Sequence, residues 1–204
     1  MAPLTIVAIS GSLRRGSHNT GLFRALQVMA PPGVTIDLFD GLRALPHFDQ
    51  DREREHVPGP VADLRRRIRT SDGIVIATPE YNSAIPGVLM NALDWASRPA
   101  EDASLRGRPV AILGASPSQF GTARAQTVLR QVLHRIQAPV VAQPEITVFR
   151  SHERFDTEGR LLPDPATEAL MRRLLDELVR LIRVTRASTS PQREAAPVAS
   201  SRTP

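Results

Sequence analysis

Hydroxyl, guanidinium and amide side chains crowd the segment SGSLRRGSHN at 10–19. An apolar run precedes it and a segment of helical period follows, which predicts a turn between a strand and a helix. Backbone N–H groups and hydroxyls at the start of a helix bind anions, and the forked guanidinium of Arg14 suits phosphate oxygens. The turn is therefore predicted to hold a phosphomonoester, with an ordinary capped turn as the alternative.

A second polar loop, TPEYNSAIP, follows another apolar run. Pro79 and Pro86 restrict its backbone, and between them stand Glu80, Tyr81 and Asn82. A rigid loop of this kind can offer N–H and C=O groups to a planar polar heterocycle, with Tyr81 as an aromatic wall. A hydrogen-bonded turn with Tyr81 on the surface is an equally good interpretation of this loop.

A third loop, GASPSQFGTARAQ, places Ser116 and Ser118 after an apolar run and Phe120 and Gly121 before a helical segment. Its GASPS is close to the G-x-S-x-G elbow of serine hydrolases, but Ser118 stands where the elbow needs glycine. His134 lies in a helical run, where a surface or packing role is more usual than that of a catalytic base. Serine hydrolysis is therefore a disfavoured alternative.

Two absences from the composition exclude several kinds of chemistry. The chain has no cysteine and no lysine, so all 26 of its basic residues are arginine. Thiol nucleophiles, cysteine metal sites, Walker-type phosphate loops and Schiff bases are excluded, because each needs a thiol or an amine. The five histidines show no metal-binding spacing. Any redox chemistry must therefore use a bound organic cofactor.

The order of elements predicts an α/β fold in one domain. Strands are expected at 4–10, 34–39, 73–78, 108–116 and 139–149, the last in two pieces because of Pro144. Apolar helical faces are expected at 22–29, 60–70, 88–96, 128–136 and 170–182. This alternation is typical of a doubly wound parallel sheet in either of its two common strand orders, and ligands of such sheets bind beyond the carboxyl ends of the strands.

Three segments stand apart from this alternation. Residues 41–58 have no clean period and are predicted to be a surface excursion. The domain is expected to occupy 1–185, and the Ser/Pro/Ala-rich segment 186–204 is expected to be a disordered tail. The apolar N-terminus is short and lacks a positive region, so we expect no signal peptide and a cytoplasmic protein. Trp95, at the end of a helical segment, is interpreted as a packing or dimer-contact residue.

The charge pattern makes large partners unexpected. The net charge is +5, from 26 basic and 21 acidic residues, but the arginines are scattered among acids, as in DREREH, and aromatic residues are few. Neither nucleic acid nor a membrane is therefore expected as a partner.

The segments GSLRRGSHN, PEYNSAIPGVLMNALDW and GASPSQFGTARAQTVLRQVL together resemble the NAD(P)H-dependent FMN reductase family of flavodoxin-like proteins. This family includes bacterial chromate- and quinone-reducing flavoproteins and related azoreductases. The resemblance covers about residues 4–150 and is most specific in the second segment. It implies a flavodoxin-like doubly wound five-stranded sheet of order 2-1-3-4-5, bound FMN, and a homodimer or homotetramer.

The resemblance also implies roles for individual residues. The phosphate of FMN would be held by Ser10, Arg14, Ser17 and Asn19. The isoalloxazine would be lined by Pro79, Glu80, Tyr81 and Asn82. The other side of the pocket would be closed by Ser116, Phe120 and Gly121. The chain departs from many relatives at Pro117–Gln119, where they are rich in glycine, which leaves nicotinamide access the least defined feature.

The expected chemistry needs no catalytic side chain, because N5 of the flavin accepts the hydride. NADPH or NADH would be the electron donor, and Arg15, Arg106 and Arg124 are candidates for a 2′-phosphate. The acceptor would be a small molecule: a quinone, a flavin, an azo compound or a metal oxyanion such as chromate. A non-enzymatic flavin-binding electron carrier or regulator is the alternative. Electron-carrying flavodoxins are typically acidic, so the positive charge of this chain favours an enzyme.

Overall fold

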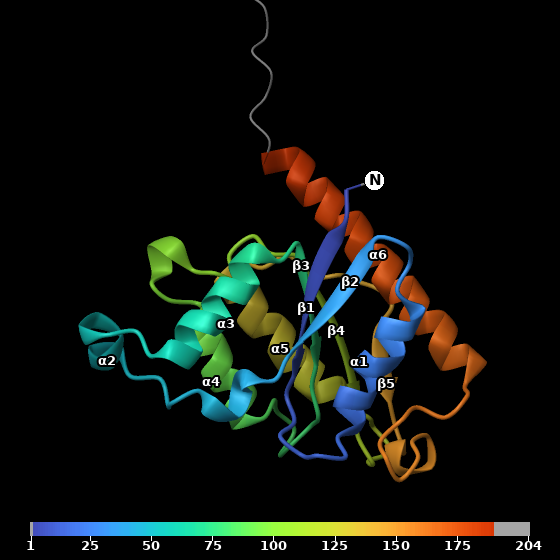
Figure 1. The fold of residues 1–204 in the computed structure, drawn as a ribbon. Helices are drawn as coiled ribbons and strands as arrows, with labels where there is room; N and C mark the ends of the chain where they lie inside the picture. The colour runs from blue at the N-terminus through green and yellow to red at the C-terminus, as the bar shows by residue number, and fades with distance from the viewer. Residues whose placement is uncertain (1, 190–204) are drawn as a thin grey trace, which may run out of the picture.

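The computed structural model describes residues 2–189, and within them five strands form one parallel sheet (Figure 1). The strands are β1 (Leu4–Ser10), β2 (Val34–Phe39), β3 (Gly73–Ala77), β4 (Val110–Ala115) and β5 (Ile146–Val148). Their order is β2-β1-β3-β4-β5, and every neighbouring pair is parallel. The flavodoxin-like strand order expected from the resemblance is thus confirmed.

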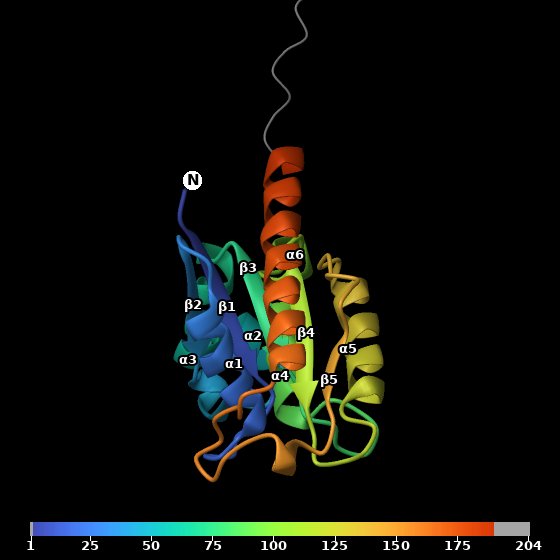
Figure 2. The ribbon, with the colours of Figure 1, turned by 90° about the vertical axis from the view of Figure 1, so that its right-hand side faces the viewer.

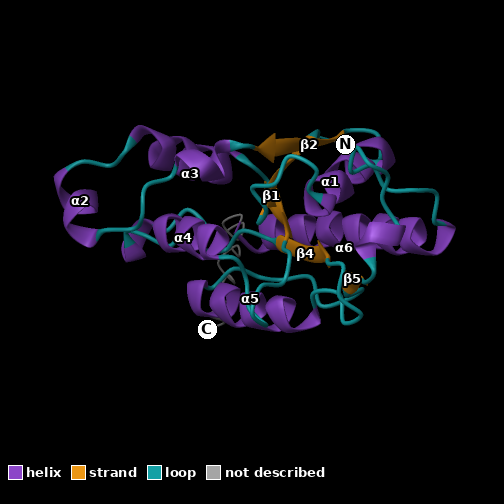
Figure 3. Cartoon of the chain, turned by 90° about the horizontal axis from the view of Figure 1, so that it is seen from below, coloured by secondary structure: helices purple, strands orange, loops and turns teal. Residues whose placement is uncertain are grey.

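Helices cover both faces of this sheet (Figures 2 and 3). One face packs against α3 (Gly59–Thr70), α4 (Gly87–Ala96) and α5 (Ala123–Ile136). The other face packs against α1 (His18–Met29) and α6 (Pro165–Thr189). The short helices are η1 (Gly41–Ala44), α2 (Gln50–Glu55), η2 (Ala100–Asp102) and η3 (Ser151–Glu153). None of the helices in the described part combines the length and apolarity needed to cross a bilayer.

The central strands β3 and β4 are apolar throughout because both of their faces are buried. In β1, Val7 and Ile9 join the core cluster under α3, α4 and α5, whereas Ile6 and Ala8 join the cluster under α1 and α6. β3 and β4 alternate between the two clusters in the same way. The central strands therefore anchor two cores, and this rigid sheet fixes the ends from which the three polar loops start.

The strand register brings those three loops to one edge of the sheet. Ser10 pairs with Ala77 and Ala77 pairs with Leu113, so β1, β3 and β4 end close together. This edge lies at the bottom of Figure 1. The carboxyl edge of a parallel sheet is where doubly wound folds bind ligands.

The excursion at 41–58, predicted to lie on the surface, is in part anchored in the core. It contains η1 and α2, and Leu42 and Leu45 are buried in the core cluster. Asn91 on α4 accepts the N–H of Phe48 (2.7 Å) and donates to the Pro46 carbonyl (2.9 Å). The excursion lacked a recognisable period because single apolar residues and side-chain hydrogen bonds anchor it.

Trp95 is a packing residue, the first of its two interpretations. Its side chain is fully buried, its indole N–H donates to the Pro46 carbonyl (2.9 Å), and Phe48 meets its ring edge-on at 5.0 Å between centroids. The buried guanidinium of Arg65 lies 5.7 Å from the centre of the same ring and pairs with Glu53 of α2. Trp95 therefore joins α4 to both the excursion and α3.

The C-terminal elements differ in detail from the prediction. The last strand comes in two pieces, as predicted: Val140 forms a separate bridge with Val110, and β5 follows. On α6 the buried face contains Met171, whereas Leu170 is exposed, so the predicted face was wrong at its first residue. The helix also runs to Thr189, past the predicted boundary at 185. The rest of the predicted tail, 190–204, lies outside the described residues.

A Gly114→Ala substitution is expected to destabilise the protein by about 1–3 kcal/mol through overpacking. A Cβ at Gly114, the last residue but one of β4, would collide with the Thr78 carbonyl and the Thr122 hydroxyl. Gly59→Ala is the matched control, since a Cβ there meets nothing within 4 Å. Urea unfolding should separate the two variants; equal midpoints would show that β4 can shift to accept the methyl group.

Candidate functional site

A cavity of about 340 Å³ opens at the carboxyl edge of the sheet, between the three polar loops. Seven of the eleven predicted site residues line it, namely Arg14, Ser17, Asn19, Pro79, Glu80, Tyr81 and Ser116. The lining residues outside the predicted set are Ser12, His18, Ala115, Pro117, Ser118 and Ser151. All but Ser151 belong to the same three loops, and Ser151 follows β5, where no local sequence pattern pointed to a site.

The first turn is built to receive an anion. Ser17 is the N-cap of α1, its hydroxyl accepts the N–H of Thr20 (3.3 Å), and the first turn of the helix carries no acidic residue. The first backbone N–H groups of a helix have no carbonyl partner within it and point out of its N-terminus. Arg14, which is exposed, adds its charge to the same cavity.

Ser10 lies beneath this turn and not in the main cavity. Its hydroxyl accepts hydrogen bonds from the hydroxyl of Thr20 (3.0 Å) and from the N–H of Ser12 (3.4 Å). It lines a smaller neighbouring cavity of about 170 Å³, to which Ser12 and Arg14 also contribute. In this structure Ser10 therefore shapes the turn from below.

Asn19 ties α1 to the end of β4. Its buried amide donates to the carbonyl of Ala115 and accepts the N–H of the same residue, both at 2.9 Å. Both ends of the amide bond the backbone of β4, which leaves one side-chain N–H and the backbone N–H of Asn19 as donors for a phosphate. Its side chain holds the start of α1 in place against β4.

Glu80 caps a helix that belongs to a different loop. Its side chain is only 5% exposed. One carboxylate oxygen accepts the N–H groups of Arg124 (3.0 Å) and Ala125 (3.1 Å) at the start of α5, and the other accepts Nε of Arg124 (2.8 Å). The N-cap residue of α5, Thr122, makes no side-chain capping bond. Glu80 therefore fastens the second polar loop to the third.

The tip of the second loop is a tight hairpin turn. Tyr81 and Ala84 exchange two backbone hydrogen bonds of 3.0 Å, and Asn82 and Ser83 between them both have positive φ, at 51° and 63°. Tyr81 is half exposed and also lines the cavity. The hydrogen-bonded turn therefore forms, and Tyr81 still borders the cavity. Asn82 occupies the tip and does not line the cavity.

The third loop closes the cavity with Ser116, Pro117 and Ser118, whereas Phe120 and Gly121 do not line it. Phe120 is 60% exposed, with the guanidinium of Arg124 5.3 Å from the centre of its ring. The hydroxyl of Ser118 bonds the Gly121 carbonyl (3.2 Å). Phe120, which the resemblance implied would close one side of the pocket, does not border the cavity in this structure.

The hydrolase alternative gains no support from the serine and histidine positions. His134 is exposed on α5. The histidine of the cavity, His18, has its Nδ1 2.8 Å from the hydroxyl of Ser151, and Ser151 is fully buried. Although Ser151 borders the cavity, its side chain has no exposed surface, so its hydroxyl is not open to a substrate in this structure.

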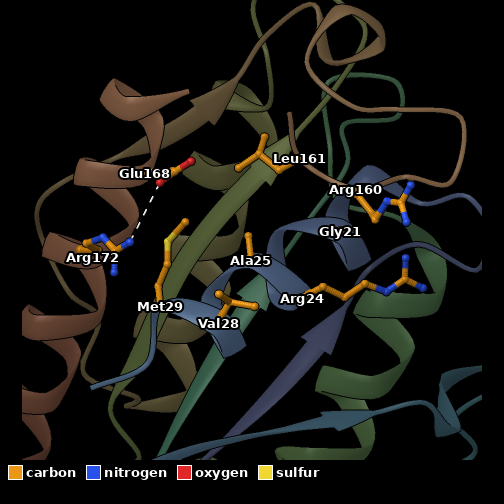
Figure 4. Close-up of a pocket in the computed structure, with 9 residues that line it drawn as sticks. All are labelled: Gly21, Arg24, Ala25, Val28, Met29, Arg160, Leu161, Glu168 and Arg172. Atoms are coloured by element: carbon orange, nitrogen blue, oxygen red, sulfur yellow. Dashed lines mark ion pairs between the residues drawn. The ribbon is translucent and has the colours of Figure 1, made fainter. Parts of the chain in front are cut away.

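A second cavity, of about 300 Å³, lies between α1 and α6 (Figure 4). Its arginines already have partners: Arg24 donates to the Glu158 carbonyl (3.4 Å), and Arg172 lies 4.0 Å from Glu168. Arg160 pairs with Asp156 (2.7 Å). The cavity at the carboxyl edge is therefore the better candidate site.

Known proteins are similar to this chain in sequence and in fold. The family model described as NADPH-dependent FMN reductase matches residues 4–153. An NAD(P)H-dependent FMN reductase of Pseudomonas aeruginosa is 42% identical over 171 residues, which cover 84% of this chain and 91% of that protein. A 2-hydroxy-1,4-benzoquinone reductase of a Burkholderia species is 38% identical, over 82% of this chain and 90% of that protein.

The solved structures agree with the sequence comparisons. The flavoenzyme FerB of Paracoccus denitrificans, an NAD(P)H:(acceptor) oxidoreductase, superposes with a TM-score of 0.80 at 32% identity, over 89% of this chain and 98% of FerB. The matched segment 4–153 contains the five strands, the three loops and every residue that lines the cavity at the carboxyl edge. The chain belongs to the NADPH-dependent FMN reductase family.

Proposed function

We propose that this chain is an FMN-dependent NAD(P)H oxidoreductase that passes electrons to small acceptors, with quinones as the leading class. The observation that carries the proposal is the cavity at the carboxyl edge, where an anion-binding helix start meets two loops of fixed shape. Relatives named FMN reductase and quinone reductase, at 38–42% identity, support the same activity.

The residues present fit FMN. The start of α1, with Ser17 and Arg14, has the donors that a phosphate needs. Pro79, Tyr81 and Pro117 give the cavity flat, mostly apolar walls suited to a planar ring system. At Gly11 a Cβ would come within 3.2 Å of Leu89 and Pro79, so the turn lies close against the second loop. Bound FMN would supply hydride acceptance and electron release, and the chain supplies binding and orientation.

The absence of cysteine and lysine agrees with this division of labour. No side chain of the cavity needs to act as a nucleophile, because hydride transfer belongs to the cofactor. Backbone N–H groups of the rigid loops would stabilise the negative charge of a reduced ring. The same face would serve donor and acceptor in turn, which predicts parallel lines in double-reciprocal plots.

We further propose that the protein is a cytoplasmic homodimer or a tetramer built from dimers. Tyr81, Met90 and Phe120 are large apolar or aromatic side chains that are 50%, 37% and 60% exposed on the site loops and α4. Exposed apolar patches commonly mark protein interfaces. Sedimentation velocity of the purified chain tests this proposal; a monomer at all concentrations would contradict it.

The activity is tested by the visible absorption spectrum of the purified chain, recorded without oxygen before and after NADPH or NADH. Flavin bands that bleach with a pyridine nucleotide and return when benzoquinone is added are the expected result. Bleaching without turnover of any acceptor would point to an electron carrier or regulator. A colourless chain that does not bind added FMN would contradict the proposal.

An Arg14→Gln variant is expected to bind FMN about tenfold to a hundredfold more weakly, the value of one charge-assisted hydrogen bond. Its affinity for riboflavin, which lacks the phosphate, should not change. Flavin fluorescence titration measures both. Arg15→Gln is the control, because Arg15 is exposed and does not line the cavity. Equal losses for the two ligands would place Arg14 away from the phosphate.

A further inference from the structure

His18 is held rigidly at the anion-binding end of the cavity. It is the first residue of α1, directly after the N-cap Ser17, and it lines the cavity with Arg14. Its ring stacks on Phe155 with 4.5 Å between centroids and 8° between planes, and its Nδ1 lies 2.8 Å from the hydroxyl of Ser151. With one face and one nitrogen fixed, the ring has little freedom to turn away.

Ser151 is itself fixed, so the orientation of the ring is set by the fold. Its side chain is fully buried, and its backbone N–H donates to the carbonyl of Ser116 (3.0 Å) on the third loop. The imidazole is thereby connected to the part of the cavity wall opposite the turn. Ser151 and Phe155 come from the segment after β5, which explains why sequence reasoning did not select His18.

The charges around His18 are mainly positive. Burial lowers the pKa of its imidazole, and the positive charges of Arg14 on the turn and His152 on η3 lower it further. Glu153, also on η3, pairs with Arg150 (2.5 Å) and lies 3.5 Å from His152. These surroundings disfavour the protonated imidazole.

Glu80 is the acidic side chain of the cavity lining, and it is already paired with Arg124 (2.7 Å). The first turn of α1 carries no acidic residue. A phosphate dianion would therefore be the main negative group near the ring. A nearby opposite charge favours the protonated imidazole.

We infer that His18 is a further ligand of the FMN phosphate, and that it binds the phosphate as an imidazolium after taking up one proton from solvent. The inference rests on the proposed function. In the bound state Nδ1–H donates to the hydroxyl of Ser151, and the proton on Nε2 is available to a phosphate oxygen. The proton gained by the ring is lost by the buffer, so the charge balances.

The direction of the pH dependence follows from linkage. The pKa of His18 is higher in the FMN-bound protein than in the free protein, so affinity rises as the pH falls between these two values. One proton gives at most about a tenfold change in Kd per pH unit. The phosphate acts oppositely, because its second pKa is about 6 and the monoanion binds less well. Only a comparison with variants isolates His18.

The experiment measures FMN binding to the flavin-free full-length chain between about pH 5.5 and 8.5. Isothermal titration in two buffers with different ionisation enthalpies counts the protons taken up. His18→Gln can keep a hydrogen bond to Ser151, and His18→Phe keeps the stacking on Phe155; neither side chain titrates. His152→Gln and the ligand riboflavin are the controls.

The expected result is an uptake near neutral pH that is larger in the wild-type chain and in His152→Gln than in the two His18 variants. Riboflavin should bind without this uptake. Equal uptake and equal pH slopes in the wild-type chain and both His18 variants would overturn the inference while leaving FMN binding intact. Loss of the uptake in His152→Gln alone would also overturn it. Absence of FMN binding at every pH would overturn the proposed function itself.

Discussion

An Asn19→Leu variant should unfold with a free energy about 2–4 kcal/mol lower than that of the wild-type chain. Leucine has a similar size, but it leaves the N–H and the carbonyl of Ala115 without the two 2.9 Å bonds that the buried amide makes. Each buried backbone group left unpaired costs about 1–3 kcal/mol. Urea unfolding followed by circular dichroism measures the loss as a shift in midpoint at unchanged slope.

The same substitution should raise the Kd for FMN about tenfold, equivalent to 1.4 kcal/mol. The tie to Ala115 sets where the start of α1 stands relative to the third loop, and both border the cavity. A preorganised site binds more tightly because the loops need no ordering.

Asn91→Leu provides a matched control for this prediction. Asn91 also bonds two backbone groups, the Phe48 N–H and the Pro46 carbonyl, but these lie in the excursion and outside the cavity lining. It should lose stability and keep its affinity for FMN. If Asn19→Leu unfolds at a lower urea concentration but retains the wild-type Kd, the hydrogen bonds between Asn19 and Ala115 stabilise the fold and do not shape the site.

The sequence was sufficient for the sheet and for the position of the cavity. The predicted runs 4–10 and 34–39 coincide with β1 and β2. A central strand such as β3 is apolar throughout, because it is buried on both faces. Parallel strands then bring their carboxyl ends to one edge, so three polar loops that follow strands must meet. The strand order itself came from the resemblance, since the pattern allowed two orders.

The partners of individual side chains could not be predicted. Asn19 and Glu80 were expected to contact a ligand, and the structure shows their polar atoms on backbone groups 96 and 44 residues away. His18 depends on Ser151, 133 residues further on. Local spacing identifies residue types able to bind a ligand, but the three-dimensional fold decides which of them have free polar atoms. The residue contacts with FMN therefore stay predictions.

A Glu80→Ala variant should lose about 2–3 kcal/mol of stability, although Arg124 is half exposed and its ion pair contributes little. Most of the loss comes from the N–H groups of Arg124 and Ala125, which lose their cap at the start of α5. Glu80→Gln keeps one carbonyl oxygen that can accept these N–H groups, so its stability should lie between those of the wild-type chain and Glu80→Ala. Thermal and urea unfolding measure the loss of stability in each of the two variants.

The effect of Glu80→Ala on the affinity for FMN shows whether Glu80 only caps α5 or also shapes the cavity. If the carboxylate holds the second loop against the third, its removal should raise the Kd for FMN about tenfold, and added salt should not reproduce the effect. Glu177→Ala is the control, since Glu177 forms an exposed pair with Arg180 (2.7 Å) on α6 and should change stability by less than about 1 kcal/mol. An unchanged Kd in a destabilised Glu80→Ala variant would limit Glu80 to capping α5. A raised Kd in that variant, with a wild-type Kd in the destabilised Asn91→Leu, would mean that the connection between two loops, and not general stability, shapes the flavin side of the cavity.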